Sequence, residues 1–562
     1  MCSTAFARVR RAPSAAAFSL LTLFVFGQAA SVSGQTPPPP PAPVATSATQ
    51  QPPPPPEGPV RKLTVDESVA LALEQNLNLR VQRLDPQIAD LQIATVRTAW
   101  TPTATSTIAA NSRDIPPTSF LEGGTGVITN EGFSTVFGLE QVLPTGGRYA
   151  INWDGSRSET SSIFTNFNPS LNSNLNLFAT QPLLRNFRID ALRQQLLISR
   201  NNRDISDIDL RNTVVSTVRN VKNAYWNLVF QRSSLRVAQQ SLDLARESLR
   251  NNRIRVEVGT MAPIDIIEAQ AEVARNEEAV IQAEAGVKQA EDNLRALIMD
   301  PSAPDFWTMT IEPTDPPQFQ STAVDIDAAV RTALEKRTDI RRARKTLESS
   351  DVNIRYFRNQ LLPELNVNAS YGLQGIGGTQ FEPLRDFTPG SVVERAIIAQ
   401  RGFGSALRNI FANDFPAWRF SLSVGYPIGR SSAEANLARA KVEYTRSQTE
   451  IKAMELQIAT RIRDLGRQVN TNQKRVESTR AARELAEQRL DAEQKKFGVG
   501  MTTTFFVFQA QRDLAQARNN ELRAILDYTN SLVDFEAAQE ASIGGGGTIT
   551  VAGAGGGAFP QQ

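Results

Sequence analysis

Few residues in this sequence could carry out chemistry. The chain has 562 residues, no histidine and a single cysteine, Cys2. Without histidine there is no imidazole base, no histidine-ligated zinc site and no Ser-His or Cys-His nucleophile. Lys and Arg number 60 against 58 Asp and Glu, so the charge balance gives no reason to expect a nucleic-acid partner. We therefore expect a protein that is not an enzyme and that binds no metal, cofactor or nucleic acid.

Two small clusters of side chains remain as candidates for function. Asp265 and Glu268 follow one glycine-containing segment, and Phe506 and Gln509 stand 241 residues further along the chain. A ring of apolar side chains resists wetting and can stop ion flow, whereas a ring of acids favours cations. Both clusters also have plainer interpretations. Phe506 would equally suit a helix core, and an acid such as Asp265 is favoured at a helix N-terminus.

The two clusters correspond because the chain repeats itself. An offset of 261 residues, without a gap, relates Val69, Ala72, Leu73, Glu74, Arg80, Asp90, Arg97 and Pro102 to Val330, Ala333, Leu334, Glu335, Arg341, Asp351, Arg358 and Pro363. An offset of 241 relates Val258, Gly259, Ala269 and Gln270 to Val499, Gly500, Ala510 and Gln511. A duplication this long, far beyond the period of a solenoid, predicts two similar halves packed about a pseudo-symmetry axis.

Helices of two lengths are predicted in each half. A first amphipathic helix, over 64–100 and again over 325–361, ends before a proline that cannot continue it. A longer helix from about 191 to 256 carries an apolar residue at every seventh position, namely Val214, Val221, Leu228, Leu235, Leu242 and Leu249. The second half repeats this seam with Ile462, Val469, Val476, Leu490 and Phe497, interrupted by Arg483. A seven-residue period indicates left-handed coiled coils, here roughly 100 Å long.

Glycine-containing breaks, at 256–265 and 497–504, end the long helices, and shorter helices then return to about 299 and 540. Glycine suits the left-handed backbone that closes a helix, and proline or threonine suits the first turn of the next one. We therefore expect two tight helix–helix tips, far from the strands.

Strand-like alternation lies between the first helix and the long helix of each half. In 171–177, 365–371 and 418–426, apolar residues alternate mostly with Asn or Ser. A transmembrane barrel wall with a wet lumen has this pattern, and a half-buried soluble sheet has the same period. The long coiled coils favour the barrel, because soluble filaments do not carry such strands between their helices. A further hairpin-like segment occupies 133–142 and 148–156.

The ends of the chain differ in composition from its middle. Basic residues followed by a short apolar stretch predict a signal peptide cleaved near 30–34, and no later run of 18 apolar residues could form a membrane-spanning helix. The predicted organisation is a signal peptide (1–33), a Pro-rich linker (34–62), a first helix-strand-helix repeat (63–300), an inter-repeat crossover (301–323), a second repeat (324–540) and a Gly-rich disordered tail (541–562).

With these features the sequence resembles the TolC-like outer membrane efflux proteins over nearly all of 63–540. The pattern of the tips, from Val258 through Asp265 and from Val499 through Ala510, carries the resemblance most specifically. Segments 181–185 and 425–430 are similar to the family's junctions between a strand and a long helix.

This resemblance implies a mixed α/β membrane protein that forms a homotrimer. An antiparallel β-barrel in the outer membrane, in contact with its lipid, would continue into a long α-helical coiled-coil barrel in the periplasm. Two strands per half would supply 12 strands in three copies, unless the extra hairpin changes the count rather than extending above the membrane. The implied function is the passive outer membrane channel of a tripartite efflux or type I secretion system, with a periplasmic adaptor and an inner-membrane pump as partners. A periplasmic or surface coiled-coil structural protein remains the alternative.

The resemblance also implies roles for individual residues. The adaptor would dock on the two tips, at Val258, Gly259, Thr260, Val499, Gly500 and Met501. Members of the family commonly close the tunnel with a ring of aspartates, whose positions hold Phe506 and Gln509 here. We therefore expect a pore constriction formed by Phe506 and Gln509, with Asp265 and Glu268 as a nearby acidic ring. Thr502 stands where the family has a basic residue, so the salt bridge of that residue is not expected.

Overall fold

The computed structural model describes residues 59–116, 127–162, 164–316, 319–383, 395–429 and 431–539. All of them belong to one compact unit, Glu57–Gln562. The predicted signal peptide, the Gly-rich tail, most of the Pro-rich linker and Arg430 of the second junction segment lie outside the described residues.

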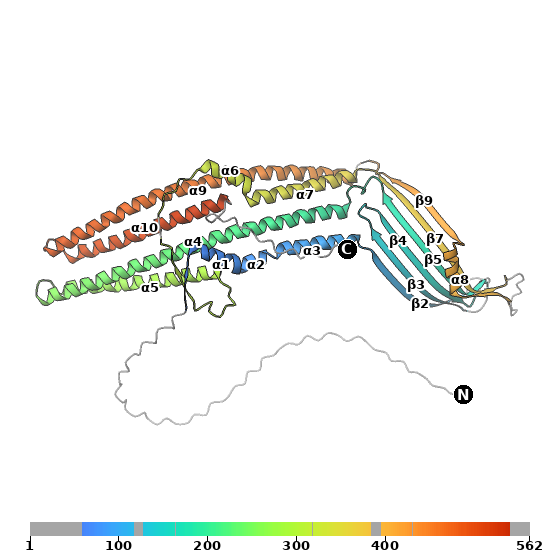
Figure 1. Ribbon diagram of the computed structural model, residues 1–562, viewed down its shortest axis with the longest axis horizontal. Coiled ribbons are helices and arrows are strands. Elements are labelled where there is room, and N and C mark those ends of the chain that lie inside the picture. The colour runs from blue at the N-terminus through green and yellow to red at the C-terminus, as the bar shows by residue number, and fades with distance from the viewer. Residues whose placement is uncertain are drawn as a thin grey trace, which may run out of the picture. The chain divides into compact units, whose positions relative to one another are not determined.

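Seven strands form one antiparallel sheet in the order β2-β3-β4-β5-β7-β8, and β9 pairs with β7 beside β8 (Figure 1). Their bounds are β2 (Thr103–Ile115), β3 (Ile128–Val142), β4 (Arg148–Thr160), β5 (Phe167–Pro182), β7 (Glu364–Phe381), β8 (Ile397–Arg401) and β9 (Pro416–Gly425). β9 pairs with 364–373 of β7 and β8 with 378–381. Among the described residues, β2 and β9 therefore have no strand on their outer edges.

The hairpin that the sequence left open is a full part of this sheet. β3 pairs with β2 and β4 pairs with β5 over most of their lengths. The first half therefore contributes four strands to the sheet, which corresponds to the alternative in which the hairpin changes the strand count. β2 was not singled out from the sequence because its threonines alternate with small residues rather than with large apolar ones, which weakens the period-two signal.

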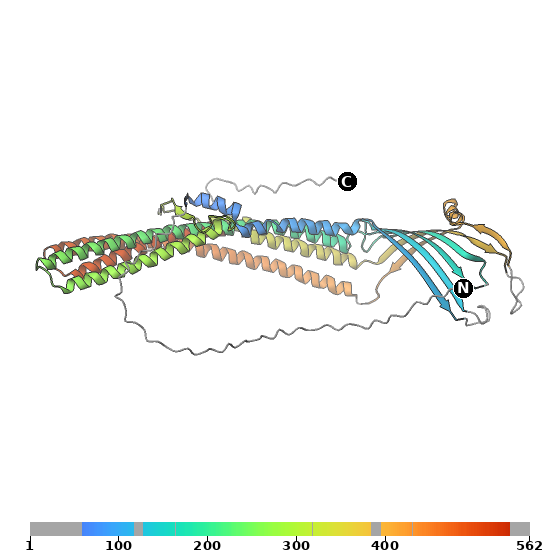
Figure 2. The same cartoon turned by 90° about the horizontal axis from the view of Figure 1, so that it is seen from below.

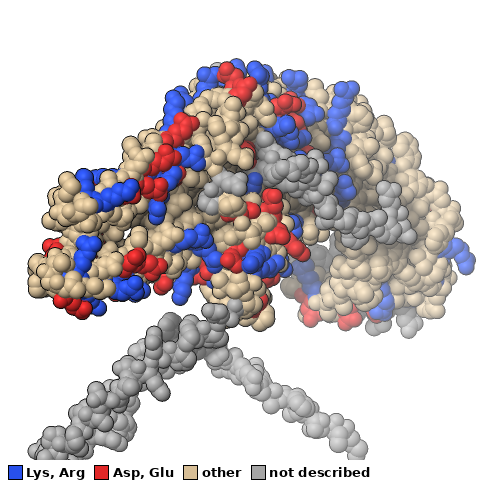
Figure 3. All heavy atoms as spheres, turned by 60° about the vertical axis from the view of Figure 1, so that its left-hand side comes forward, with Lys and Arg blue, Asp and Glu red and all other residues tan. Residues whose placement is uncertain are grey.

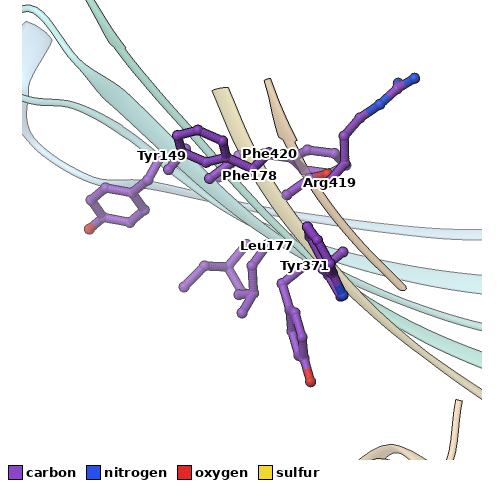
Figure 4. A pocket seen from close by; sticks show the side chains of 12 residues that line it. Tyr149, Leu177, Phe178, Tyr371, Arg419 and Phe420 are labelled. Atoms are coloured by element: carbon purple, nitrogen blue, oxygen red, sulfur yellow. The ribbon is translucent and has the colours of Figure 1, made fainter. Parts of the chain in front are cut away.

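The register of the strands separates an apolar face from a polar one. The apolar face carries Ile108, Phe137, Ile151, Leu175, Leu177, Tyr371 and Leu422, and the polar face carries Thr105, Asn152, Asn174, Asn176, Asn368 and Ser421. In Figure 4, Tyr149, Leu177 and Tyr371 extend to one side of the strands and Arg419 to the other. The predicted alternation of apolar residues with Asn and Ser is thus confirmed as two chemically distinct faces.

Helices form the remainder of the unit, with bounds α1 (Val65–Gln75), α2 (Leu77–Gln82), α3 (Asp85–Arg97), η1 (Thr98–Trp100), α4 (Ala191–Glu257), α5 (Ile264–Ile298), α6 (Ile326–Lys336), α7 (Thr338–Gln360), α8 (Phe403–Ala412), α9 (Ser432–Gly498) and α10 (Thr504–Gln539). α5 packs back along α4, and α10 packs back along α9 (Figures 1 and 2). α4 also contacts α3, α7 and α10, while α7 contacts α9. None of the helices in the described ranges combines the length and the hydropathy needed to cross a membrane.

The seven-residue seams lie in the core, as the sequence predicted. Val221 and Leu228 of α4 and Ile462 and Val469 of α9 are fully buried. Arg483, which interrupts the second seam, lies 2.6 Å from Glu521 on α10 and 3.0 Å from Glu487 on its own helix. The charge at this seam position is therefore paired rather than misplaced.

The first helix of each half is not continuous, which corrects the predictions over 64–100 and 325–361. The first breaks at Asn76, whose backbone is extended and whose Oδ1 accepts a hydrogen bond from the Leu79 N–H at 3.1 Å. The second breaks at Arg337, whose guanidinium bonds to Asp339 at 2.7 Å. In the first case an asparagine competes with the helix by capping the next turn.

A short parallel pair, β1 (Val60–Leu63) with β6 (Thr310–Pro313), was not predicted. Buried Tyr225 of α4 fixes it, because its Oη lies 2.9 Å from Asp315 Oδ2 and 3.1 Å from the Leu63 carbonyl. Burial is the main cause that raises the pKa of Tyr225 to about 12 from 10.0. The neutral phenol therefore stabilises the fold fully below pH 10, and this contribution falls as the pH rises from 10 towards 12.

Tyr225→Phe should loosen the β1–β6 pair. Loss of the hydroxyl leaves its buried partners, including the Leu63 carbonyl, one hydrogen bond short, at a cost of about 1 kcal/mol. Amide exchange in β1 and β6 should speed up about fivefold at neutral pH. Tyr528→Phe removes a similar pair of bonds, to Gln320 and Thr322, and should leave β1 and β6 unchanged. Equal exchange in the wild type and Tyr225→Phe would contradict the assignment.

Candidate functional site

The first tip closes α4 with a Schellman motif. Gly259 has a φ of 75°, a left-handed conformation that costs glycine little. The Thr260 N–H donates to the Arg255 carbonyl at 2.9 Å, and the Gly259 N–H donates to the Val256 carbonyl at 3.0 Å. These two bonds satisfy carbonyls that the helix end would otherwise leave unpaired.

The second tip has the same geometry. Gly500 has a φ of 76°, the Met501 N–H donates to the Lys496 carbonyl at 2.9 Å, and the Gly500 N–H donates to Phe497 at 3.1 Å. The predicted tight tips are therefore present at both positions.

The tips present apolar side chains to solvent. Val258, Val499 and Met501 are all exposed, and a Cβ built on Gly259 or Gly500 would meet no atom within 4 Å. Figure 3 shows basic and acidic side chains interspersed along the helices, without a large patch of one sign. A partner at the tips would thus meet small apolar side chains and open backbone rather than a strong charge.

Among the constriction candidates, Asp265 has a defined partner. It lies in the first turn of α5, and its Oδ1 accepts a hydrogen bond of 2.9 Å from Thr504 Oγ1 in the first turn of α10. Thr504 is buried. This bond joins the two helical hairpins at their tips, and the N-terminal turn of α5 also favours an acid electrostatically.

Phe506 does not belong to the core of the described chain. It is 49% exposed and its ring packs edge-on against Phe505, at 5.5 Å between centroids. The next two residues, Val507 and Phe508, are buried. The apolar run 505–508 is thus divided between an exposed pair and a buried pair.

Glu268 and Gln509 complete the predicted set. Glu268 is exposed and Gln509 is partly buried. Neither side chain has a hydrogen bond or an ion pair within the described ranges. The structure therefore joins Asp265 to Thr504, and it does not join the four predicted residues to one another inside one chain.

Two further contacts across the hairpins were missed from the sequence. The Arg255 guanidinium lies over the Phe497 ring at 4.7 Å, which links the ends of α4 and α9. Buried Glu272 of α5 lies 3.5 Å from Arg512 of α10. The repeat gave no signal for this ion pair, because Ala271 and Asp513 occupy the positions that correspond to Arg512 and Glu272.

These contacts flank a groove of about 230 Å³ between α4, α9 and α10, with Asn252, Thr504 and Phe508 in its wall. Near the end of α9, a hydrogen bond from Lys496 lowers the pKa of Glu493 from 4.5. No group of three potential metal-ligating side chains occurs within the described residues. The contacts at this site link the two helical hairpins mechanically.

The chain is similar to known proteins in its sequence profile and in its fold. The sequence profile of the outer membrane efflux protein family matches residues 69–298 and 329–539. No curated protein sequence matches the chain. Similar solved structures include CusC, with 15% identity and a TM-score of 0.60 over 85% of this chain and 92% of that one. The CmeC channel of Campylobacter jejuni (14%, 0.59, 84% and 85%) and the MtrE channel of Neisseria gonorrhoeae (17%, 0.57, 84% and 88%) are also similar. At these identities the likeness shows the fold.

Thr504→Val should loosen the tips without unfolding the hairpins. Valine keeps the size of the side chain but removes the donor to Asp265, at a cost of about 1 kcal/mol. Amide exchange in the first turns of α5 and α10 should therefore increase about fivefold. Thr503→Val, at the exposed neighbouring position, is the matched control. Identical exchange in the two variants would show that the hydrogen bond does not hold the tips together.

Proposed function

The chain belongs to the outer membrane efflux protein family, and on that premise we propose that three copies form a passive export duct. Membership confirms the family resemblance, and with it an outer membrane localisation that extends into the periplasm. Members of the family are channels rather than enzymes, so the expectation of a non-enzyme is confirmed as well. Family membership therefore supports the general function of an outer membrane efflux channel.

The observation that carries the trimer and the barrel is a two-faced sheet with two open edges. In hydrocarbon every backbone polar group needs a partner within the protein, so an open edge is not tolerated there. Pairing of β2 with β9 of the next copy would close both edges. Six long strands from each of three copies give a barrel of 18 strands, an even number as bacterial barrels have. The apolar face would then meet lipid, and the Asn- and Thr-rich face would line the lumen.

A second observation on the helices supports the same assembly. Along α2, α3 and the turn between them, exposed residues follow one another at spacings of four and three: Leu77, Val81, Leu84, Ile88 and Leu91. This is the spacing of a coiled-coil seam, and it has no partner helix on the described chain. The first half of α9 exposes a complementary row of mostly small residues at the same spacings, including Ala435, Ala438 and Val442. We place these two surfaces against each other between neighbouring copies.

In this proposal the helices continue the barrel into the periplasm as a coiled-coil tunnel. A periplasmic adaptor would dock on the tips at 258–260 and 499–501, and an inner-membrane pump would supply the energy through it. Substrate would move outward through the tunnel. Residues 1–33 would be removed as a signal peptide, 34–62 would form a linker, and 541–562 a disordered tail, around the two repeats 63–300 and 324–540 and their crossover 301–323.

The constriction would lie where α5 and α10 begin. Half-exposed Phe506 and Gln509 would turn towards the axis, and Asp265 and Glu268 would add negative charge nearby. The bond between Asp265 and Thr504 holds the two hairpins together in this structure. Opening by separation of the hairpins would break it, together with the contact between Glu272 and Arg512.

Leu91→Glu should reduce trimer formation. Leu91 is 68% exposed on one chain, so the chain itself should fold, whereas a carboxylate buried in a seam between copies is costly. Molar mass in detergent, measured by light scattering, should shift from three chains towards one. Val258→Glu, at a tip position that is also 68% exposed, should remain trimeric. A fully trimeric Leu91→Glu protein would rule out this seam.

Phe506→Ala should raise the resting conductance of the trimer in planar bilayers, because an apolar ring that excludes water would be widened. Glu268→Gln should reduce cation selectivity, and it is the cleaner acid to test because it has no bond to lose within the described residues. If the Phe506→Ala channel loses stability while its conductance stays the same, Phe506 contributes to helix packing and does not form the constriction.

The tips should contact a periplasmic protein in cells. A photo-crosslinking residue at Val258 or Val499 should yield an adduct, and the same residue at Leu422 on the sheet should not. Gly259→Trp should abolish the adduct formed at Val499. Gly259→Ala imposes the same backbone strain at positive φ but adds little bulk, so this variant should still form the adduct at Val499. Adducts at Leu422 but not at either tip would contradict tip docking.

A further inference from the structure

Helix α8 belongs neither to the helical hairpins nor to the sheet. It contacts β5, β7 and β8 and lies on the apolar face, where three glycines make room for it. A Cβ at Gly375 would collide with the Ala406 carbonyl, one at Gly377 would lie 3.0 Å from the Gly402 carbonyl, and one at Gly155 would lie 2.9 Å from Phe403. The sheet is thus shaped to seat a helix on the face that the proposed barrel turns to lipid.

The register fixes the level of α8 along the sheet. Gly155 and Gly375 both pair with Ser173, and Arg157 and Gly377 both pair with Leu171. The odd-numbered residues of β4 share this face. Tyr149, Ile151 and Trp153 are aromatic or aliphatic, whereas Arg157 and its ion-pair partner Glu159 are charged. The N-terminus of α8 therefore stands level with the first charges on this face, where hydrocarbon gives way to headgroups.

The C-terminus of α8 points back towards the helical end of the sheet. Asn413, in the left-handed conformation that ends the helix, accepts a hydrogen bond of 2.7 Å from the Tyr371 hydroxyl. Since Tyr371 precedes Gly377 on β7 by six residues, α8 runs from the headgroup level into the apolar zone. One helix thus spans the boundary between the two.

The two sides of α8 differ in chemistry. Ala406 and Ile410 are buried against the sheet, and Phe403 packs edge-on against Trp153 at 6.4 Å. With 3.6 residues per turn, Arg408 lies on the opposite side. Phe411, one turn nearer the C-terminus, is 87% exposed. The outer side of the helix therefore carries a cation followed by a large aromatic ring.

Arg408 is the one charged residue within α8. It is exposed and has no ion pair within the described residues. Arg401, just before the helix, pairs with Gly378, which pairs with Ser170 on the polar face, so Arg401 lies on that face. The only acid among residues 395–415 is Asp414, which faces the Asn409 amide at 3.3 Å. An arginine on a lipid-facing surface is costly inside hydrocarbon but favourable beside a phosphate. Arg408, on the outer side of α8, is therefore expected to bind an anionic group at headgroup depth.

We propose that α8 is an interfacial helix that binds phosphate-bearing lipids of the outer leaflet. Arg408 contacts a lipid phosphate, and Phe411 inserts among the acyl chains beneath it. This inference rests on the proposed barrel, whose apolar face must meet lipid. It adds a defined lipid site near the β7 edge, next to the junction between neighbouring copies.

Depth can be measured with spin labels, because Cys2 is the only native cysteine. The full-length chain with Cys2→Ser carries a single added cysteine at Phe411, Leu422 or Ser421. It is reconstituted in phosphatidylcholine bilayers containing phosphatidylglycerol. Leu422 and Ser421 are neighbours on β9 whose side chains lie on opposite faces. Collision with oxygen reports the acyl region, and collision with a water-soluble nickel complex reports water.

The label at Phe411 should behave like the label at Leu422 and favour oxygen. If Phe411 instead favours nickel while Leu422 favours oxygen, the helix does not enter the bilayer and the inference is wrong, although the barrel stands. If the label at Leu422 is as accessible to nickel as the label at Ser421, the apolar face does not meet lipid and the proposed barrel is wrong.

Headgroup recognition is tested separately by native mass spectrometry of protein extracted from the same bilayers. Arg408→Gln should retain severalfold less phosphatidylglycerol than the wild type, and Arg408→Lys should retain most of it, since the charge is kept. Protein from bilayers of phosphatidylcholine alone gives the background. Equal phosphatidylglycerol retention by the wild type and Arg408→Gln would overturn the proposed phosphate contact.

Discussion

The constraint on which the rest of the structure depends is the pairing of backbone groups at the edges of the sheet. Water satisfies an open edge on a soluble protein, but hydrocarbon cannot. β2 and β9 each leave one edge without a strand in the described chain, and the family places the protein in the outer membrane. The proposed closure by further copies of the chain would reconcile these two facts, and it would give each face of the sheet a chemically suitable neighbour.

Closure of the proposed barrel must also be compatible with the number of helices in each copy. The β3–β4 hairpin explains how the two numbers can differ. The hairpin widens the sheet by two strands without adding a helix, since its turn docks where β5 leads into α4. Thr145 Oγ1 lies 3.0 Å from Gln181 Oε1, and Gly146, with a φ of 82°, packs closely against the Asn186 carbonyl. The proposed barrel of 18 strands could therefore continue into the proposed tunnel with fewer helices than strands, because the β3–β4 hairpin of each copy ends at the junction.

The sequence predicted best those features that depend on local periodicity. The buried seam through Val221 and Ile462 follows from a seven-residue repeat, and the tips at Gly259 and Gly500 follow from the need of a helix end for a left-handed residue. The breaks at Asn76 and Arg337 were missed, because one residue interrupts an otherwise helical pattern, at Asn76 by capping the next turn with its side chain and at Arg337 without a side-chain cap.

Features that depend on contacts between distant residues were not predictable in the same way. The bond between Asp265 and Thr504 joins residues 239 apart in the chain, and neither residue type reveals its partner. The number of strands was left open because pairing partners determine whether a hairpin continues a wall or projects from it. Helix α8 was missed because its ten residues are too few for a convincing period, and its place depends on glycines in other elements.

The most direct test of this account is a three-dimensional reconstruction by electron cryo-microscopy of the full-length protein extracted in detergent. The account predicts three copies around one axis, a barrel of 18 strands, and β2 of each copy paired with β9 of the next. A wall of 12 strands with β3 and β4 outside it would contradict the account. A particle in which the edges of β2 and β9 remain unpaired would contradict it as well.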